Sequence, residues 1–223
     1  MNDEKEGFDL HSVLTEVLPL KYGTDRCQNT LNLIDQSIAT HIRLQLAFSA
    51  STLKDDISQW RAYTQLGQGV CIEFEDGFIA NRSAKKAECL YDFEEKRRAI
   101  IEDDDLKLSD DSLNKLLAKP EGSKKYISSL INTLVKFKSP SFEPEKEVRW
   151  VYTASGITKS SQVKFRPHRL GLTTYRAVAV NLDKVLSITI GPQVPMQNLK
   201  SIEDFLIIND CSGFVTKSNV SLR

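Results

Sequence analysis

The chain lacks several features that would assign a class of protein at once. Its 223 residues include four scattered cysteines, without the paired spacing of a zinc site or the density of a disulfide scaffold. Lysine and arginine together number 30, as do aspartate and glutamate, so the formal charge is zero. The sequence also has no long basic block that could neutralise a phosphate backbone. No stretch approaches the roughly 18 apolar residues of a membrane span. These absences predict reduced thiols, no metal and no membrane partner, and they make nucleic acid a weak default partner.

The N-terminus also lacks the pattern of a targeting signal, because it is acidic and polar where a signal would be basic and then apolar. We therefore expect a soluble, cytoplasmic protein. A chain of this length can bury a sizeable core without disulfide staples, and we expect residues 1–223 to form a single domain.

The spacing of apolar residues predicts helices and strands in an order typical of α+β proteins. Helices are expected over 11–20, 26–40, 93–134 with a loop at 120–122, and 199–207, with a short helical turn after Asp55 and Asp56. Strands are expected over 42–48, 70–74, 87–91, 148–152, 163–165, 177–181, 185–190 and 214–215. Because strands lie on both sides of a helical middle, we expect a mostly antiparallel sheet core with helices in the middle of the chain.

One segment rich in polar and aromatic residues follows the strand expected over 42–48. It begins with a Ser-x-Ser pair, Ser49 and Ser51, and continues to a Trp and a Tyr three residues apart, Trp60 and Tyr63. A Trp and a Tyr at this spacing on a helical turn are more often core residues than a platform for a ligand. The serines are common in strands and carry little weight alone.

A second segment, far along the chain, places charge on a strand. Glu145, Glu147 and Arg149 alternate with other residues, so a strand here would carry both glutamates and the arginine on one face. Val148, Trp150 and Tyr152 would then share the other face, the one that a core would take. The charged face is either a solvated surface ladder or a site.

Several motifs in order resemble a bacterial family catalogued as domain of unknown function 2971. They read F-S-A-S-x4-D-I-S-Q-W-R-A-Y-x3-G-x-G-V-C-I-E-F over 48–74, F-x2-E-x-E-x-R over 142–149, and S-N-V-S-L-R over 218–223. Members of the family open with a strand and a helix before an L-N-D-x2-E turn, whereas this sequence starts directly at M-N-D-E. We therefore expect the opening strand and helix to be absent.

The resemblance implies an ADP-ribosyltransferase-like fold, which binds NAD between two small sheets. A Ser-x-Ser strand and a late E-x-E pair are elements of that fold's signature. The resemblance further implies that the protein acts on NAD, as a transferase or glycohydrolase in phage defence or a toxin system. NAD would then be a substrate, and no metal is expected.

The same resemblance assigns roles to individual residues. Glu147 would bind the nicotinamide ribose and stabilise the positive charge that develops as nicotinamide leaves. Glu145 would orient the acceptor or act as its base. Ser49 and Ser51 would support the nicotinamide pocket. Trp60 or Tyr63 would supply an aromatic face, and Arg149 would hold a diphosphate or neutralise Glu147.

Two other classes of function stay open at this point. One is a non-catalytic module that binds a nucleotide, another ligand or a partner protein through the same cleft. The other is an inactive domain whose open sheet edge promotes self-association. Arg166, His168 and Arg169 could meet a phosphate, but a solvated loop is the commoner fate of such a cluster.

Overall fold

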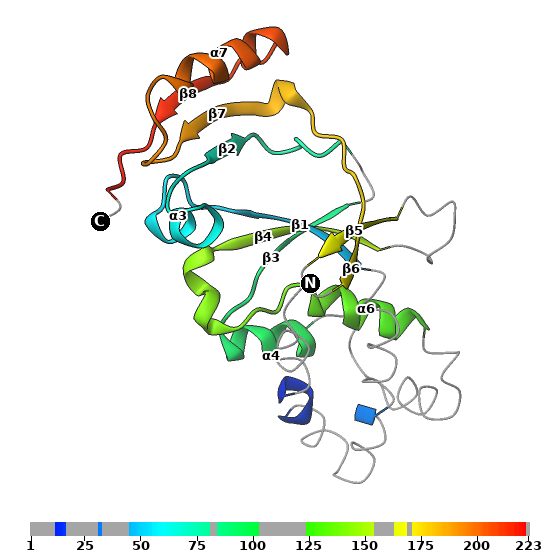
Figure 1. Ribbon diagram of the computed structural model, residues 1–223. Coiled ribbons are helices and arrows are strands. Elements are labelled where there is room, and N and C mark those ends of the chain that lie inside the picture. Colours follow the sequence, from blue (N-terminus) through cyan, green and yellow to red (C-terminus); the bar gives the residue numbers. More distant parts are fainter. Residues whose placement is uncertain are drawn as a thin grey trace. The chain divides into compact units, whose positions relative to one another are not determined.

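The computed structural model describes residues 12–16, 31–32, 45–80, 84–102, 124–153, 163–168 and 171–221 (Figure 1). The contacts within the chain gather in two compact units. Unit 1 comprises Met1–Ala50, Lys85–Glu143 and Glu147–Arg176, and unit 2 comprises Ser51–Ala84, Pro144–Lys146 and Ala177–Arg223. A single domain over residues 1–223 therefore stays a prediction.

Unit 1 is built on a three-stranded sheet in the order β1-β4-β3 (Figure 1). Its strands are β1 (Gln45–Ser51, whose last residue is assigned to unit 2), β4 (Glu147–Thr153) and β3 (Lys85–Glu88), and β3 runs antiparallel to β4. Two helices, α4 (Phe93–Ile101) and α6 (Lys124–Leu134), belong to the same unit. A separate antiparallel hairpin pairs β5 (Lys164–His168) with β6 (Gly171–Tyr175).

The core of unit 1 gathers around the end of α6. Leu130 and Phe137 are fully buried, and Leu134 is nearly so. The segment after the helix is tied down by Leu90, whose N–H donates to the carbonyl of Lys136 at 2.6 Å and whose own carbonyl accepts from Lys138 at 3.1 Å. Residues 135–138 are thus held in place on the sheet side of the helix end, where they take part in the site described below.

Unit 2 holds a second three-stranded sheet, in the order β2-β7-β8. Strand β2 (Val70–Phe74) runs antiparallel to β7 (Val185–Ile190), and β8 (Phe214–Lys217) runs parallel to β7. The helix α7 (Asn198–Ile208) packs on this sheet through Leu206, which forms a core with Val185 and Ile188.

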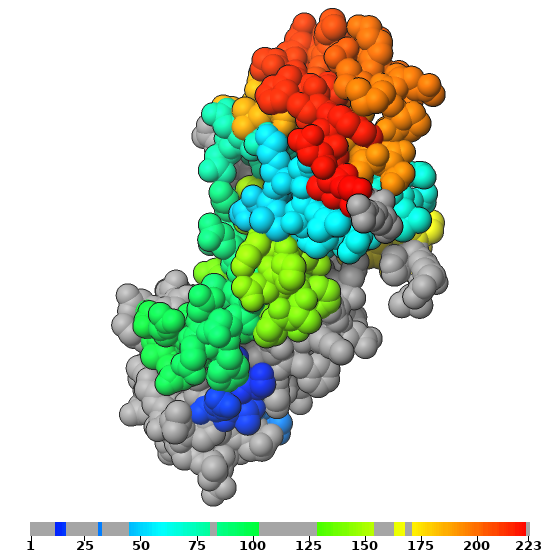
Figure 2. Space-filling model, turned by 90° about the vertical axis from the view of Figure 1, so that its left-hand side faces the viewer, coloured from blue at the N-terminus to red at the C-terminus, as the bar shows by residue number. Residues whose placement is uncertain are grey.

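A short helix, α3 (Ile57–Tyr63), lies between β1 and β2 in the chain. Asp56 caps it by accepting from the N–H groups of Ser58 and Gln59. The neighbouring Asp55 accepts from the Trp60 indole at 2.8 Å and from the Ser218 hydroxyl at 2.5 Å. The C-terminal residues therefore lie against the start of α3, as the red and cyan segments of Figure 2 show.

The α+β class and most elements agree with the sequence-based expectations. The strands over 70–74 and 185–190, the helix over 199–207 and the short helix after Asp56 are confirmed. The helices expected over 11–20 and 26–40 lie outside the described residues, apart from 12–16 and 31–32, and so does the loop at 120–122. No helix within the described residues is long and apolar enough to cross a membrane.

Two strand predictions need correction. The strand expected over 177–181 is wrong, because this segment makes an isolated bridge between Val180 and Ile79 and belongs to no ladder. Strand β6 was missed, because its Gly-Leu-Thr-Thr-Tyr sequence gives no apolar alternation and it pairs only with the neighbouring β5.

Candidate functional site

Glu147 and Arg149 form a buried ion pair on one face of β4. Arg149 binds the carboxylate through two nitrogens, Nε to Oε1 at 2.8 Å and Nη2 to Oε2 at 3.1 Å. Only 8% of Glu147 and 4% of Arg149 is exposed. The expectation of one face shared by these two residues is confirmed, but that face is neither solvated nor open.

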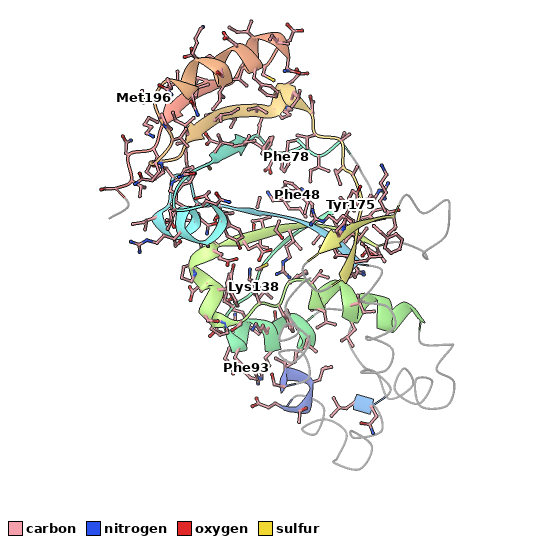
Figure 3. The ribbon with its side chains drawn as sticks, in the orientation of Figure 1. Phe48, Phe78, Phe93, Lys138, Tyr175 and Met196 are labelled. Carbon is pink, nitrogen blue, oxygen red and sulfur yellow. The ribbon has the colours of Figure 1, made fainter. Side chains whose placement is uncertain are left out.

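The segment after α6 covers this charged face. Arg149 Nη1 donates to the carbonyl of Val135 at 3.0 Å, and the ammonium group of the buried Lys138 binds Glu147 Oε2. Figure 3 shows Lys138 on this side of the sheet and Phe48, from β1, on the opposite side. The cluster of Glu147, Arg149 and Lys138, called here the buried ion cluster, is therefore part of the packed interior of unit 1.

Hydrogen bonds hold Glu147 in its ionised form. Burial raises the pKa of Glu147, but hydrogen bonds from Arg149, Lys138 and Ser49 outweigh it and lower the pKa to about 2. A carboxylate has about four acceptor positions. Arg149 takes two of them, and Lys138 and Ser49 take one each, so the carboxylate of Glu147 has its full set of donors.

Two members of this environment had no signal in the sequence. Lys138 follows a helix, where a lysine is usually solvated, and only the fold brings it to Glu147. Tyr91 is also buried, and its hydroxyl accepts from the N–H of Glu147 at 2.7 Å. Burial raises the pKa of Tyr91, so this hydroxyl stays protonated at neutral pH.

Glu145 does not lie on the strand with Glu147, and the expectation of a Glu-Glu-Arg face is wrong in this respect. Glu145 ends a 3₁₀ helix, η3 (Pro140–Glu145), and the next residue, Lys146, has a φ of +42°. That left-handed residue interrupts the extended backbone, so β4 begins only at Glu147. The Glu145 carbonyl accepts from the side chains of Ser51 and Gln59, at 2.7 and 3.4 Å.

The remaining predicted site residues fall in two groups. Ser49 lies in unit 1 and donates to Glu147, whereas Ser51, Trp60 and Tyr63 lie in unit 2. Trp60 is a core residue with 3% of its surface exposed, but Tyr63 is 65% exposed. Their assignment to NAD stays a prediction.

The opposite face of the unit 1 sheet carries aromatic rings that solvent reaches. Phe48 is 37% exposed, and Trp150 and Tyr152 are half-buried, although the sequence predicted that Trp150 and Tyr152 would meet the core. The rings of Phe48 and Trp150 contact edge to face, with centroids 6.0 Å apart. We call these three side chains the aromatic face.

Two cations lie over the rings of the aromatic face. Lys86, opposite Trp150 in the β3–β4 ladder, places its ammonium nitrogen 5.8 Å from the centre of the Trp150 ring. Arg176 stacks on Tyr152, with its guanidinium carbon 3.7 Å from the ring centre. Both contacts fall within the range of cation–π attraction. An aromatic surface bordered by cations offers stacking area and positive charge to the same ligand.

Comparison with known proteins bears on the predicted family. Residues 59–150 match the model of a family described as a protein of unknown function (DUF2971). Over these residues the chain is similar to DUF2971. The family predicted from the motifs is thereby confirmed, and no curated protein and no solved structure matches the chain. The DUF2971 match includes the buried ion cluster, Tyr91, Lys86 and Trp150.

Proposed function

We propose that this domain is a non-catalytic ligand-binding module, and that its aromatic face binds nucleotides. The observation that carries the proposal is the gathering of Phe48, Trp150 and Tyr152 on one partly exposed sheet face with Lys86 and Arg176 against the rings. Any of the bases can stack on an aromatic ring, and a guanidinium or ammonium group binds the phosphate of the same nucleotide. Both needs of a nucleotide are met within one unit.

The buried ion cluster supports this module structurally. It lies on the opposite face of β4, and the contacts of Arg149 with Val135 and of Glu147 with Lys138 tie the strand that presents Trp150 and Tyr152 to the segment after α6. A carboxylate whose acceptor positions are all taken has nothing left for an incoming ribose hydroxyl. For this reason the binding module is preferred to a catalytic site at Glu147.

Calorimetric titration with AMP tests the proposal, because AMP joins one base to one phosphate. We expect saturable binding that Trp150→Leu weakens roughly tenfold, since stacking contributes about 1–3 kcal/mol per base. Phe205→Leu is the matched control, because Phe205 is an exposed aromatic residue of unit 2, 50% exposed. Equal loss in both variants, or no binding of AMP to the parent protein, would sink the proposal.

The role of cations is tested with a second matched pair. Lys86→Gln should weaken AMP binding and lower its salt dependence, because one ammonium contact with the phosphate is lost. Lys200→Gln removes the same charge from an exposed position on α7 and should leave both unchanged.

A second candidate function is an NAD-directed transferase or glycohydrolase of the ADP-ribosyltransferase type. The contact of Ser49 with Glu147 favours it, because it joins the Ser-x-Ser strand to the second glutamate of the E-x-E motif. Glu147 is ionised at neutral pH, and a substrate hydroxyl would displace the Ser49 hydroxyl most easily, since Ser49 is the neutral donor among the three. Release of nicotinamide from NAD, lost in a Glu147→Gln variant shown to be folded, would support this function. No release by the parent protein would exclude it.

A further inference from the structure

The β5–β6 hairpin concentrates positive charge in a chain whose formal charge is zero. Residues 150–182 contain five basic residues, Lys159, Lys164, Arg166, Arg169 and Arg176, and no aspartate or glutamate. The balanced charge of the whole chain therefore hides a local excess. A local excess of positive charge favours an anionic ligand even where the whole chain is neutral.

The pairing of the two strands sorts the hairpin into two faces. Lys164 lies opposite Tyr175 and Arg166 opposite Thr173, so these four residues share one face, called here the basic face. Lys164 and Arg166 are exposed, and the Arg166 guanidinium lies 5.9 Å from the centre of the Tyr175 ring, as diagonal neighbours do. The basic face thus repeats the combination of cation and aromatic ring found on the aromatic face.

The other face of the hairpin is apolar. Phe165 and Leu172 are 56% and 74% exposed, and Pro167 lies opposite Leu172. A membrane would take this apolar face, and the cations would then point away from the lipid head groups. A nucleic acid strand would instead take the basic face, where cations and an aromatic ring point the same way. The arrangement favours nucleic acid.

Arg176 connects the hairpin to the aromatic face. It directly follows the last residue of β6, Tyr175, and stacks on Tyr152 of β4 at 3.7 Å. The end of the hairpin is therefore fixed beside the rings of Tyr152 and Trp150, within unit 1. Figure 3 labels Phe48 and Tyr175, which belong to the two surfaces that Arg176 joins.

We infer that the ligand of the aromatic face is a single strand of nucleic acid, whose backbone continues along the basic face of the β5–β6 hairpin. This inference rests on the proposed function and names its substrate class. One or two bases stack on the aromatic face, and the neighbouring phosphates meet Arg176, Arg166 and Lys164. Single strands are bound in this way by aromatic rings for the bases and a positively charged track for the backbone.

Fluorescence anisotropy with a labelled oligothymidylate of about twelve nucleotides, within the usual site sizes for such proteins, tests the inference. We expect the oligonucleotide to bind at least roughly tenfold more tightly than thymidine monophosphate, since it adds phosphate contacts. The double variant Lys164→Gln, Arg166→Gln should remove most of this gain and lower the slope of log K against log salt by about 1.4, or about 0.7 per contact. Monophosphate binding should not change in that variant.

A matched double variant controls for the loss of charge. Lys85→Gln with Lys200→Gln removes two exposed positive charges elsewhere and should bind the oligonucleotide like the parent protein. Monophosphate binding without tighter oligonucleotide binding would overturn the inference and leave the proposed function standing. If neither the monophosphate nor the oligonucleotide binds, the proposed function itself is refuted. A third outcome would also overturn the inference. The protein would bind anionic vesicles, Leu172→Ser would abolish that binding, and the double variant Lys164→Gln, Arg166→Gln would bind the oligonucleotide like the parent protein. This outcome would show that the hairpin binds membranes.

Discussion

Replacing Glu147 by Gln should destabilise the fold strongly at neutral pH and progressively less as the pH falls below 4.5. The substitution keeps the size of the side chain but removes the negative charge that two buried cations, Arg149 and Lys138, share. Removing one partner of a buried pair leaves the other charge uncompensated, and this is what costs stability. The same carboxylate is lost in the parent protein when Glu147 is protonated.

The pKa of Glu147 sets the size and the pH range of the effect. Folding lowers this pKa from 4.5 to about 2. A pKa difference of one between the folded and unfolded states corresponds to about 1.4 kcal/mol, so the ionised carboxylate contributes about 3 kcal/mol to the free energy of unfolding. Because the pKa is depressed in the folded state, this contribution is complete well above pH 4.5. It is lost as the pH falls through 4.5 toward 2.

Urea unfolding of the parent protein and of Glu147→Gln, followed from about pH 7 down to about pH 3, measures this contribution. The difference in free energy of unfolding should be about 3 kcal/mol at pH 7 and should shrink steadily below pH 4.5. Glu88→Gln, an exposed substitution in the same sheet, should leave the free energy within about 0.5 kcal/mol of the parent at pH 7. A difference that is constant with pH, or below about 1 kcal/mol at pH 7, would refute the ion cluster as described.

Three further substitutions test other parts of the fold by urea unfolding. Tyr91→Phe leaves the buried N–H of Glu147 without its acceptor and should cost about 1–3 kcal/mol; no loss would mean that water replaces the hydroxyl. Asp55→Asn should lower the free energy of unfolding by about as much, because its amide nitrogen would face the donors of Ser218 or Asn219. Its control is Asp210→Asn, which lies at a similar positive φ of 53° but is exposed and should cost little. Gly191→Ala would place a methyl carbon 2.1 Å from a backbone oxygen and should prevent stable folding, whereas Gly77→Ala, with open space but a φ of 84°, should cost only about 1 kcal/mol.

The sequence predicted which residues share a strand face better than it predicted which face is buried. Alternation placed Glu147 with Arg149 and Trp150 with Tyr152 correctly, because the side-chain period of a strand is local. Burial depends on what covers each face, and residues 135–138 come from outside the strand. Charged residues normally mark the solvent face, so the pattern of β4 gave no sign that Glu147 and Arg149 are buried as deeply as Val148 of the other face.

The error at Glu145 has a local cause that the sequence does not display. A positive φ at a lysine is uncommon, and nothing in the neighbouring residues announces it. The Arg176–Tyr152 stack was missed for another reason. Tyr152 precedes the β5–β6 hairpin in the chain and Arg176 follows it, so their contact depends on the path of the chain between them. Family motifs led to the correct family, but motif order carries no information on which side chains meet solvent.

If a nucleotide stacks on the aromatic face, the fluorescence of Trp150 changes when it binds. The chain has two tryptophans, so Trp60→Phe leaves Trp150 as the sole tryptophan. Titration of this variant with AMP should quench or shift the emission of Trp150 saturably, at the concentrations that calorimetry gives for the parent protein. Unchanged emission while AMP binds would place the ligand elsewhere on the molecule and contradict stacking on the aromatic face.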